Sequence, residues 1–283
     1  MEKMVKPVIT YGAEIWGFNM HKCVEDVQVK YGRFMLGLPS SAPRASILGD
    51  CGFTPIHVDC ILKAVKYWLR LIKLEPTSLC KSAYLMLYEL DLAGRKTWAG
   101  EVRRLLLRLG FDEAWEAQQI GNENVFLSEL KSKLLTIAYE NWEENVISNN
   151  RLVSYRQYKT VYNYELYVST LSNINLRRAL ARLRNSSHCL FIETGRHNGT
   201  PRHERICPSC KNMDSVEVIE DEYHFVCRCY LYKDLRLKFL PAYINEYPCH
   251  EMFNNLMLSK NTSEIRNFAI FVNEAFKIRA NYT

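Results

Sequence analysis

The sequence predicts a mainly α-helical fold with a small metal-binding segment near its C-terminal end. Three observations predict this class. Apolar residues recur with a helical period along much of the 283-residue chain, and only short clusters of Gly, Pro and Ser interrupt them. Four cysteines and one histidine lie together between residues 207 and 229, a composition typical of a zinc site.

The composition is that of a globular protein. With 48% hydrophobic and 24% charged residues, the chain can bury a core as one large domain or two smaller ones. Its ten cysteines show no disulfide-framework spacing, and the first residues, MEKMVKPVIT, lack the apolar stretch of a signal peptide. No apolar run approaches the ~20 residues that cross a bilayer. We therefore expect a soluble protein with reduced thiols, in the nucleus or cytoplasm, without a membrane partner.

The first 150 residues contain several segments with helical periodicity. Helices are expected over 30–36, 61–74, 99–111 and 122–147, and ordered turns over 36–43 and 49–55. In the second helix Leu62, Val65 and Leu69 share one face, and Gly110 is expected to end the third. The tryptophans of this region are expected to be core residues rather than ligand contacts. They are Trp98, Trp115 and Trp142.

Residues 151–167 interleave tyrosines with cations. Tyr155, Tyr158 and Tyr162 fall on one face of a helix and would pack there, although rings beside cations also suit base stacking on single-stranded nucleic acid. The packing interpretation is favoured for the tyrosines. The cations Arg156 and Lys159 are expected to contact phosphates.

A basic helix is expected over 175–188. Its apolar stripe contains Leu176, Leu180 and Leu183, and the remaining surface carries Arg177, Arg178, Arg182 and Arg184. Because no acid within the helix offsets these arginines, the pattern favours contact with a polyanion, with a merely solvated face as the alternative.

The charge around this helix is also basic. Residues 151–211 contain 11 Lys and Arg against 3 Glu, whereas 212–229 contain one Arg against five acids. A short apolar run, interpreted as a possible strand, begins at Cys189 and leads into a Gly-rich turn with Arg196, a further predicted phosphate contact.

Cys207 and Cys210 form a C-x2-C turn that can present two thiolates to one metal, and His224 follows. A thioredoxin-like dithiol would need a βαβ setting, which this region does not supply. The fourth ligand is either Cys227 or Cys229. A regular helix from His224 places Cys227 on the same face, but zinc sites tolerate longer spacings, so periodicity leaves both open.

Characteristic strings follow one another along nearly the whole chain. They are VITYGAEIWG (8–17), LGLP (36–39), KYWLRL (66–71), residues 151–167, ALARLRNSSHCLFIETGRH (179–197), CPSC (207–210), EDEYHF (220–225) and CYLYKDLR (229–236). Together and in this order they resemble the C-terminal region of LINE-type (non-LTR) retrotransposon reverse transcriptases, beyond the polymerase palm. The chain departs from that family at DCGF (50–53), where the family tends to have a Leu-Gly-Arg string.

The resemblance implies a CCHC zinc knuckle whose fourth ligand is Cys229, with Cys227 as the alternative. It also implies five segments, listed by function. These are a thumb-like helical segment (1–93), a helical connector (94–150), a basic nucleic-acid-binding arm (151–206), the zinc knuckle (207–240) and a C-terminal helical tail (241–283). Zinc would be structural, and the partners would be RNA or DNA and a reverse transcriptase polymerase domain encoded elsewhere.

No catalytic activity is expected from this chain alone. The sequence has no Asp-Asp pair for two-metal polymerisation and none of the common hydrolase or nucleotide-binding motifs. The acidic run 220–222 is expected to be solvated or to support the metal ligands. The competing hypothesis is an inactive retroelement-derived helical fragment, or a protein-interaction module without a nucleic-acid function.

Overall fold

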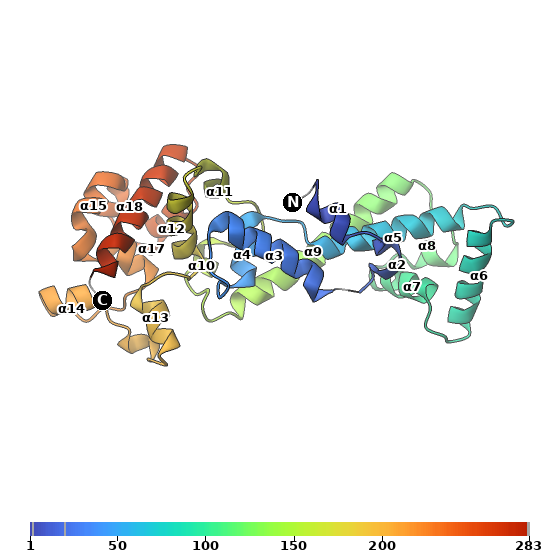
Figure 1. The fold of residues 1–283 in the computed structure, drawn as a ribbon, viewed down its shortest axis with the longest axis horizontal. Coiled ribbons are helices and arrows are strands. Elements are labelled where there is room, and N and C mark those ends of the chain that lie inside the picture. Colours follow the sequence, from blue (N-terminus) through green and yellow to red (C-terminus); the bar gives the residue numbers. More distant parts are fainter. Residues whose placement is uncertain (2, 20, 282–283) are drawn as a thin grey trace. The chain divides into compact units, whose positions relative to one another are not determined.

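The computed structural model describes residues 1, 3–19 and 21–281, and its regular structure is almost entirely helical (Figure 1). Over these ranges the extended pairing consists of a single antiparallel bridge between Ile206 and Ile219. The mainly α-helical class predicted from the sequence is confirmed.

The chain folds into two compact units, and neither is one continuous stretch of sequence. Unit 1 consists of Met1–Gln28 with Thr54–Asn141, and unit 2 consists of Val29–Phe53 with Trp142–Thr283. The five segments inferred from the sequence do not coincide with these units. Residues 29–53 pack with the C-terminal half of the chain rather than with the remainder of segment 1–93.

Unit 1 is a bundle of helices around two tryptophans. Its helices are α1 (Val5–Ile9), α2 (Ala13–Trp16), the start of α3 (Lys22–Leu36), α5 (Ile56–Ile72), α6 (Leu79–Leu92), α7 (Trp98–Arg108), α8 (Asp112–Glu116) and most of α9 (Glu123–Ile147). Trp68 and Trp115 stack with ring centroids 6.1 Å apart, and both are buried. The Trp68 indole nitrogen donates a hydrogen bond to the Tyr84 hydroxyl at 3.0 Å. Burial of this polar atom is therefore compensated.

Local signals in the sequence fix the ends of α7. The Thr97 side chain accepts a hydrogen bond from the Gly100 amide at 3.1 Å, which satisfies one of the free donors of the first turn. Beyond the last turn Gly110 has a φ of 69°, the left-handed conformation that favours glycine after a helix. The predicted end at Gly110 is confirmed, as is the long helix over 122–147.

Unit 2 contains the basic helix and the cysteine cluster. Its elements are the end of α3, α4 (Arg44–Cys51), the end of α9, α10 (Tyr155–Tyr158), α11 (Leu166–Thr170), α12 (Ile174–Arg184), α13 (Phe191–His197), η1 (Arg202–Glu204), α14 (Pro208–Asp214), η2 (His224–Arg228), η3 (Tyr230–Tyr232), α15 (Lys233–Phe239), α16 (Ala242–Glu246), α17 (His250–Met257) and α18 (Thr262–Ala280). The predicted C-terminal tail is thus helical.

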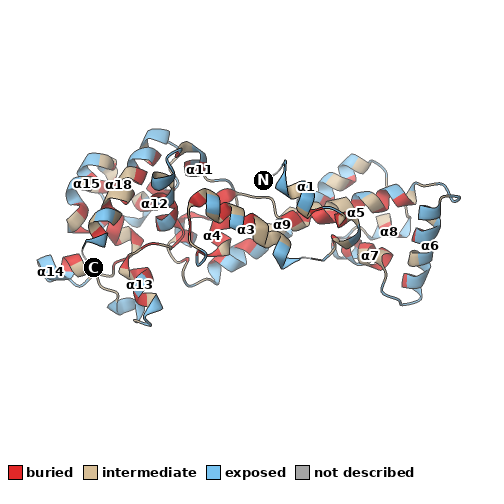
Figure 2. Cartoon of the chain, viewed as in Figure 1, coloured by how far each residue is buried: buried red, intermediate tan, exposed pale blue. Residues whose placement is uncertain are grey.

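The core of unit 2 forms where α12 packs against α18. Leu180 and Leu183 of α12 and Phe271 of α18 are almost completely buried in it. Figure 2 shows buried segments in both helices. The apolar stripe predicted for the basic helix therefore faces this core. Phe225 joins the same core and packs on Tyr232 with ring centroids 4.8 Å apart. The cysteine-rich segment is thus part of the unit's core rather than a separate appendage.

The tryptophan predictions are confirmed for two of the three rings. Trp115 and Trp142 are buried, whereas Trp98 is half-buried and packs edge-on against Phe18. Trp142 lies close to Gly49 of α4, where a β-carbon would come within 2.8 Å of the indole ring. Glycine at this position allows α4 to continue to Cys51, so the turn expected over 49–55 begins only at Gly52.

Two local predictions are wrong. The apolar run after Cys189 is not a strand but leads into α13, whose Phe191 amide donates to a Glu220 carboxylate oxygen at 2.6 Å. This cap lies 29 residues away in the sequence, where no local pattern shows it. The helix expected to carry Tyr155, Tyr158 and Tyr162 on one face also does not reach Tyr162, because α10 ends at Tyr158 and the chain then turns back toward Asp50.

Candidate metal centre and basic surface

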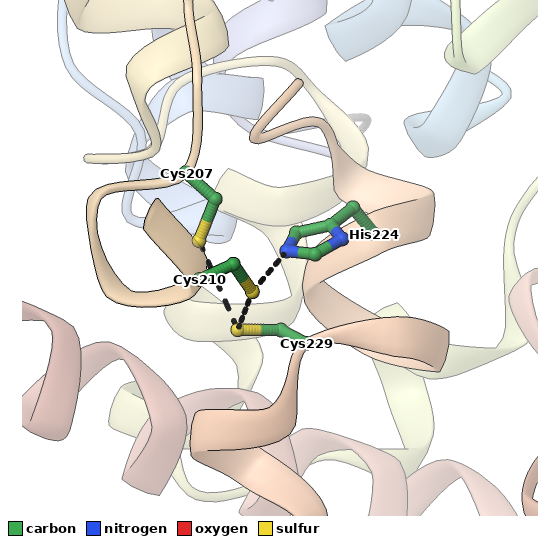
Figure 3. A group of neighbouring side chains, drawn as sticks. All are labelled: Cys207, Cys210, His224 and Cys229. Carbon is green, nitrogen blue, oxygen red and sulfur yellow. Dashed lines mark hydrogen bonds between the residues drawn. The ribbon is translucent and has the colours of Figure 1, made fainter. Parts of the chain in front are cut away.

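Cys207, Cys210, His224 and Cys229 bring four ligand atoms within 4.8 Å of one another (Figure 3). All four residues are buried. The Cys229 sulfur lies 3.9 Å from the Cys207 sulfur and 3.8 Å from the Cys210 sulfur, and the Cys210 sulfur lies 3.4 Å from Nε2 of His224. These side chains converge on a single point between them.

The spacing fits a tetrahedral metal. With metal–sulfur bonds of about 2.3 Å and metal–nitrogen bonds of about 2.0 Å, tetrahedral angles separate two sulfurs by about 3.8 Å and a sulfur from a nitrogen by about 3.5 Å. The two sulfur–sulfur distances of 3.9 and 3.8 Å and the sulfur–nitrogen distance of 3.4 Å agree with these values. The cluster could therefore hold a metal ion.

A short closed loop positions the first two ligands. Cys207 precedes Pro208, which starts α14, and its carbonyl accepts a hydrogen bond from the Lys211 amide at 3.1 Å. Proline suits this place because the first helical residue needs no amide donor. The Cys207 amide in turn donates to the Val218 carbonyl at 2.7 Å, beside the bridge at Ile206. These contacts join the two ends of the loop, residues 207 and 218.

A π-helical turn positions the other two ligands. The Asp221 carboxylate accepts a hydrogen bond from the His224 amide at 2.8 Å, and η2 follows as a π-helix. The Cys229 amide donates to the His224 carbonyl at 2.8 Å, five residues back. Because a π-turn closes over five residues and not four, it brings Cys229 over His224. A regular α-helical turn from His224 would instead close at Arg228, and Cys227, three residues on, would share the face of His224.

Cys227 has a different environment. It is buried, it is not part of the four-residue cluster, and burial raises the pKa of its thiol to about 12. A thiol with this pKa stays protonated and behaves as a small apolar core residue. Of the two fourth ligands considered from the sequence, the structure places Cys229 with Cys207, Cys210 and His224.

The cluster favours a thiolate even without a metal. The hydrogen bond from the Cys229 thiol lowers the pKa of Cys207 to about 3, and the same bond raises the pKa of Cys229. Burial raises the pKa of Cys210. A bound cation would promote loss of the thiol protons of all three cysteines, since metal ligation requires thiolates.

The two outer residues of the acidic run beside the cluster, Glu220 and Glu222, are buried rather than solvated, and Asp221 between them is half-buried. Glu220 accepts hydrogen bonds from the Arg279 guanidinium at 2.5 and 3.0 Å, and Glu222 lies 3.0 Å from the His188 ring. Ser154 also donates to Glu222, at 2.6 Å. These contacts fasten the cysteine-rich segment to α18 and to the segments around Ser154 and His188. The expectation of a solvated run is wrong for Glu220 and Glu222, because each of these carboxylates has a distant partner. The alternative expectation, support of a metal ligand, fits Asp221, whose carboxylate accepts a hydrogen bond from the His224 amide.

Two of the seven predicted phosphate contacts are buried. Arg184 is 1% exposed and pairs with Asp50 at 3.2 Å and with Glu165 at 3.1 Å. Lys159 is 2% exposed and also pairs with Glu165. These predictions are wrong, because both cations are neutralised inside the protein and neither can reach an external phosphate.

Sequence reasoning missed Asp50 as the centre of this network. Its carboxylate also accepts hydrogen bonds from the hydroxyls of Tyr167 at 2.7 Å and Tyr155 at 3.1 Å. The predicted packing of Tyr155 and Tyr158 is confirmed, since both rings are buried. The available signal was the charge of Asp50 in the turn segment DCGF (50–53), but its partners lie more than 100 residues away.

The remaining five cations reach the surface to different extents. Arg177 is half-buried and donates to the carbonyls of Met35 at 2.8 Å and Leu171 at 2.9 Å. Arg196 is half-buried and pairs with Glu193 at 3.3 Å. Arg156 is exposed and donates to the Ile147 carbonyl.

Arg178 and Arg182 differ from the other cations of the basic arm. Both are exposed on α12, one turn apart, and within the described residues neither has a hydrogen bond or an ion pair. Their guanidinium groups are therefore available to an external ligand.

Comparison with known proteins identifies no relative: no family model, no curated protein and no solved structure matches this chain. Among the helices that the structure describes, none combines the length and apolar character needed to cross a membrane.

Proposed function

We propose that unit 2 is a nucleic-acid-binding module in which a structural zinc ion fixes the cysteine-rich segment and the exposed arginines of α12 contact phosphates. The observation that carries this proposal is the pair Arg178 and Arg182. Two like charges one turn apart destabilise a helix unless an anion lies between them, and no carboxylate of the described residues does so. A phosphodiester backbone supplies that anion.

Zinc is the metal that suits the ligand set best. Three thiolates and one imidazole in a buried tetrahedral arrangement are typical of structural zinc sites, which leave no coordination position open. The ligand set is also the one implied by the resemblance to non-LTR reverse transcriptases. This agreement supports the proposal that the chain corresponds to the C-terminal region of such an enzyme, with the polymerase encoded elsewhere.

The packing of α12 explains how its arginines would be oriented. Leu180 and Leu183 are buried against α18, so the helix cannot rotate about its axis without exposing them. Arg178 and Arg182 therefore stay on the solvent-facing side of α12.

The test is a salt titration of binding. Replacement of Arg178 and Arg182 by alanine is expected to weaken binding to single-stranded RNA and duplex DNA for all sequences alike, because phosphate contacts position a protein without reading bases. Each lost contact reduces the slope of log affinity against log salt concentration by about 0.7 to 0.9. The buried face of α12 is unchanged, so circular dichroism is expected to match the wild type.

The matched control is the double variant Arg95→Ala and Lys96→Ala. It removes the same charge from an exposed loop of unit 1, between α6 and α7. Its slope is expected to equal that of the wild type. If the folded Arg178/Arg182 variant binds as tightly as the wild type with an unchanged slope, α12 is only a solvated face and the inactive-fragment hypothesis replaces this one.

We also expect no primer extension from this chain alone. Two-metal polymerisation requires neighbouring carboxylates that hold two ions about 3.5 to 4 Å apart. Within the described ranges, the Cys/His cluster is the sole convergent group of three or more candidate ligands. Incorporation of nucleotides by the purified chain with Mg²⁺, in a primer–template assay with a commercial reverse transcriptase as the positive control, would contradict this.

A further inference from the structure

A groove of about 640 Å³ lies in unit 1 among residues of α1, α5 and α9. Four lysines line it, namely Lys6, Lys63, Lys66 and Lys131, and Asp59 is its one carboxylate. The lining therefore carries a formal excess of positive charge. Clefts lined by charges of one sign concentrate ligands of the opposite sign.

Two of the lysines are fixed by partners within the groove. Lys6 forms an ion pair with Asp59, which cancels the negative charge of the lining. Lys63 donates hydrogen bonds to the carbonyl and the hydroxyl oxygens of Thr10, at 3.1 and 2.8 Å. These contacts connect α5 to the end of α1 and shape one side of the groove.

The other two lysines have no such partners. Lys66 and Lys131 are exposed, and across the part of the chain that the structure describes neither forms a hydrogen bond or an ion pair. Each follows a leucine of the groove by one helical turn: Leu62 precedes Lys66 on α5, and Leu127 precedes Lys131 on α9. Residues four apart share one helix face, so both ammonium groups lie along the same groove.

Neutral polar groups complete the lining. Asn124 and Ser128 of α9 lie one turn apart and precede Lys131 by seven and three residues on the same face. An amide and a hydroxyl can each donate a hydrogen bond to an oxygen anion. The groove thus combines unpaired cations, neutral donors and apolar walls, and its volume lies within the range of small-molecule sites.

We propose that this groove binds phosphate groups. Lysine ammonium groups are compact charges with three donors each, which suits tetrahedral oxyanions of high charge. Two sources supply this chemistry, a free polyphosphate and the backbone of a nucleic-acid strand. The groove lies in unit 1 and shares no residue with α12, so this inference goes beyond the function proposed for unit 2.

The experiment compares binding of two probes by isothermal titration calorimetry, inorganic tripolyphosphate and a single-stranded oligonucleotide of mixed sequence. The test variant is Lys66→Gln with Lys131→Gln, which keeps good helix formers at both positions. The control is Arg95→Gln with Lys96→Gln, which removes the same charge from an exposed loop of the same unit. Thermal unfolding of both variants verifies the fold.

Binding by the groove variant is expected to weaken by about tenfold for each lost ammonium group, as for hydrogen bonds between charged partners. The control is expected to bind like the wild type. Weakened tripolyphosphate binding identifies a free polyphosphate as a ligand, and weakened oligonucleotide binding alone identifies the nucleic-acid backbone. Unchanged affinity for both probes, or equal loss in the control, would overturn the proposal.

These outcomes are separable from the test of α12. Failure of the Arg178/Arg182 variant to alter nucleic-acid binding would leave tripolyphosphate binding by the groove unaffected. Loss of tripolyphosphate binding on mutation of α12 but not of the groove would instead place the phosphate site in unit 2 and refute the inference.

Discussion

Asp50→Ala is expected to lower the free energy of unfolding by about 3 to 5 kcal/mol, the cost typical of removing one partner of a buried ion pair. Asp50 is fully buried, and Arg184 is 1% exposed. Without Asp50, Arg184 retains only Glu165 as a carboxylate partner, which it shares with Lys159. Urea unfolding monitored by circular dichroism measures the change.

The control for this substitution is Glu143→Ala, which removes a carboxylate from an exposed position within α9. Surface changes of this kind usually alter stability by no more than about 0.5 kcal/mol. A loss for Asp50→Ala as small as that of the control would show that the buried network contributes little. Arg184→Met fills much of the same volume without charge but leaves Asp50 unpaired, so it is expected to destabilise as well.

The same network predicts a pH dependence. Burial alone would raise the pKa of Asp50. The positive charge of Arg184, and the hydrogen bonds that the Asp50 carboxylate accepts from Arg184 and Tyr167, nevertheless lower this pKa overall. A carboxyl whose pKa is lower in the folded state contributes stability above its ordinary value of 3.8, and this contribution is lost as the pH falls through the folded-state pKa. Asp50→Asn is expected to remove this part of the acid sensitivity.

Cys229→Ser is expected to abolish stoichiometric zinc binding, whereas Cys227→Ser is expected to retain it. The Cys229 sulfur lies 3.8 to 3.9 Å from two other ligand sulfurs, and Cys227 is outside the cluster. Because binding of a structural zinc ion contributes to folding, Cys229→Ser is also expected to unfold at a lower temperature. Elemental analysis of the purified variants, with thermal melts beside it, distinguishes the two cysteines.

Cys227→Ser serves as the matched control, since it makes the same substitution two residues away. It replaces a buried thiol by a more polar hydroxyl, so a modest loss of stability with full metal content is the expected result. Zinc retained in Cys229→Ser and lost in Cys227→Ser would overturn the ligand assignment.

Patterns within one helix or one loop were predictable from the sequence. The 3.6-residue period of α5 correctly places Val65 and Leu69 in the core, and the C-x2-C spacing identifies a turn that brings Cys207 and Cys210 together. In each case the physical cause lies within a few residues. Helix periodicity and turn chemistry act over that distance.

Contacts between distant segments were not predictable. The charge pattern of α12 predicted the same exposed role for Arg184 as for Arg182. Arg184 instead donates a hydrogen bond to Asp50, which lies 134 residues away in the sequence. The pairing exists because α4 packs where α12 ends, which tertiary structure alone determines. Similarly, helical periodicity favoured Cys227, and only the π-turn from His224 brings Cys229 into the cluster.

The account of unit 2 depends on the claim that three cysteines and one histidine bind a zinc ion. X-ray absorption spectroscopy at the zinc edge on the purified wild-type chain tests this claim most directly. We predict one zinc ion per chain with three sulfur neighbours at about 2.3 Å and one nitrogen neighbour at about 2.0 Å. A spectrum with four sulfur neighbours, or with two or fewer, would contradict the assignment of Cys207, Cys210, His224 and Cys229. The absence of stoichiometric metal in protein purified without chelator would contradict it as well.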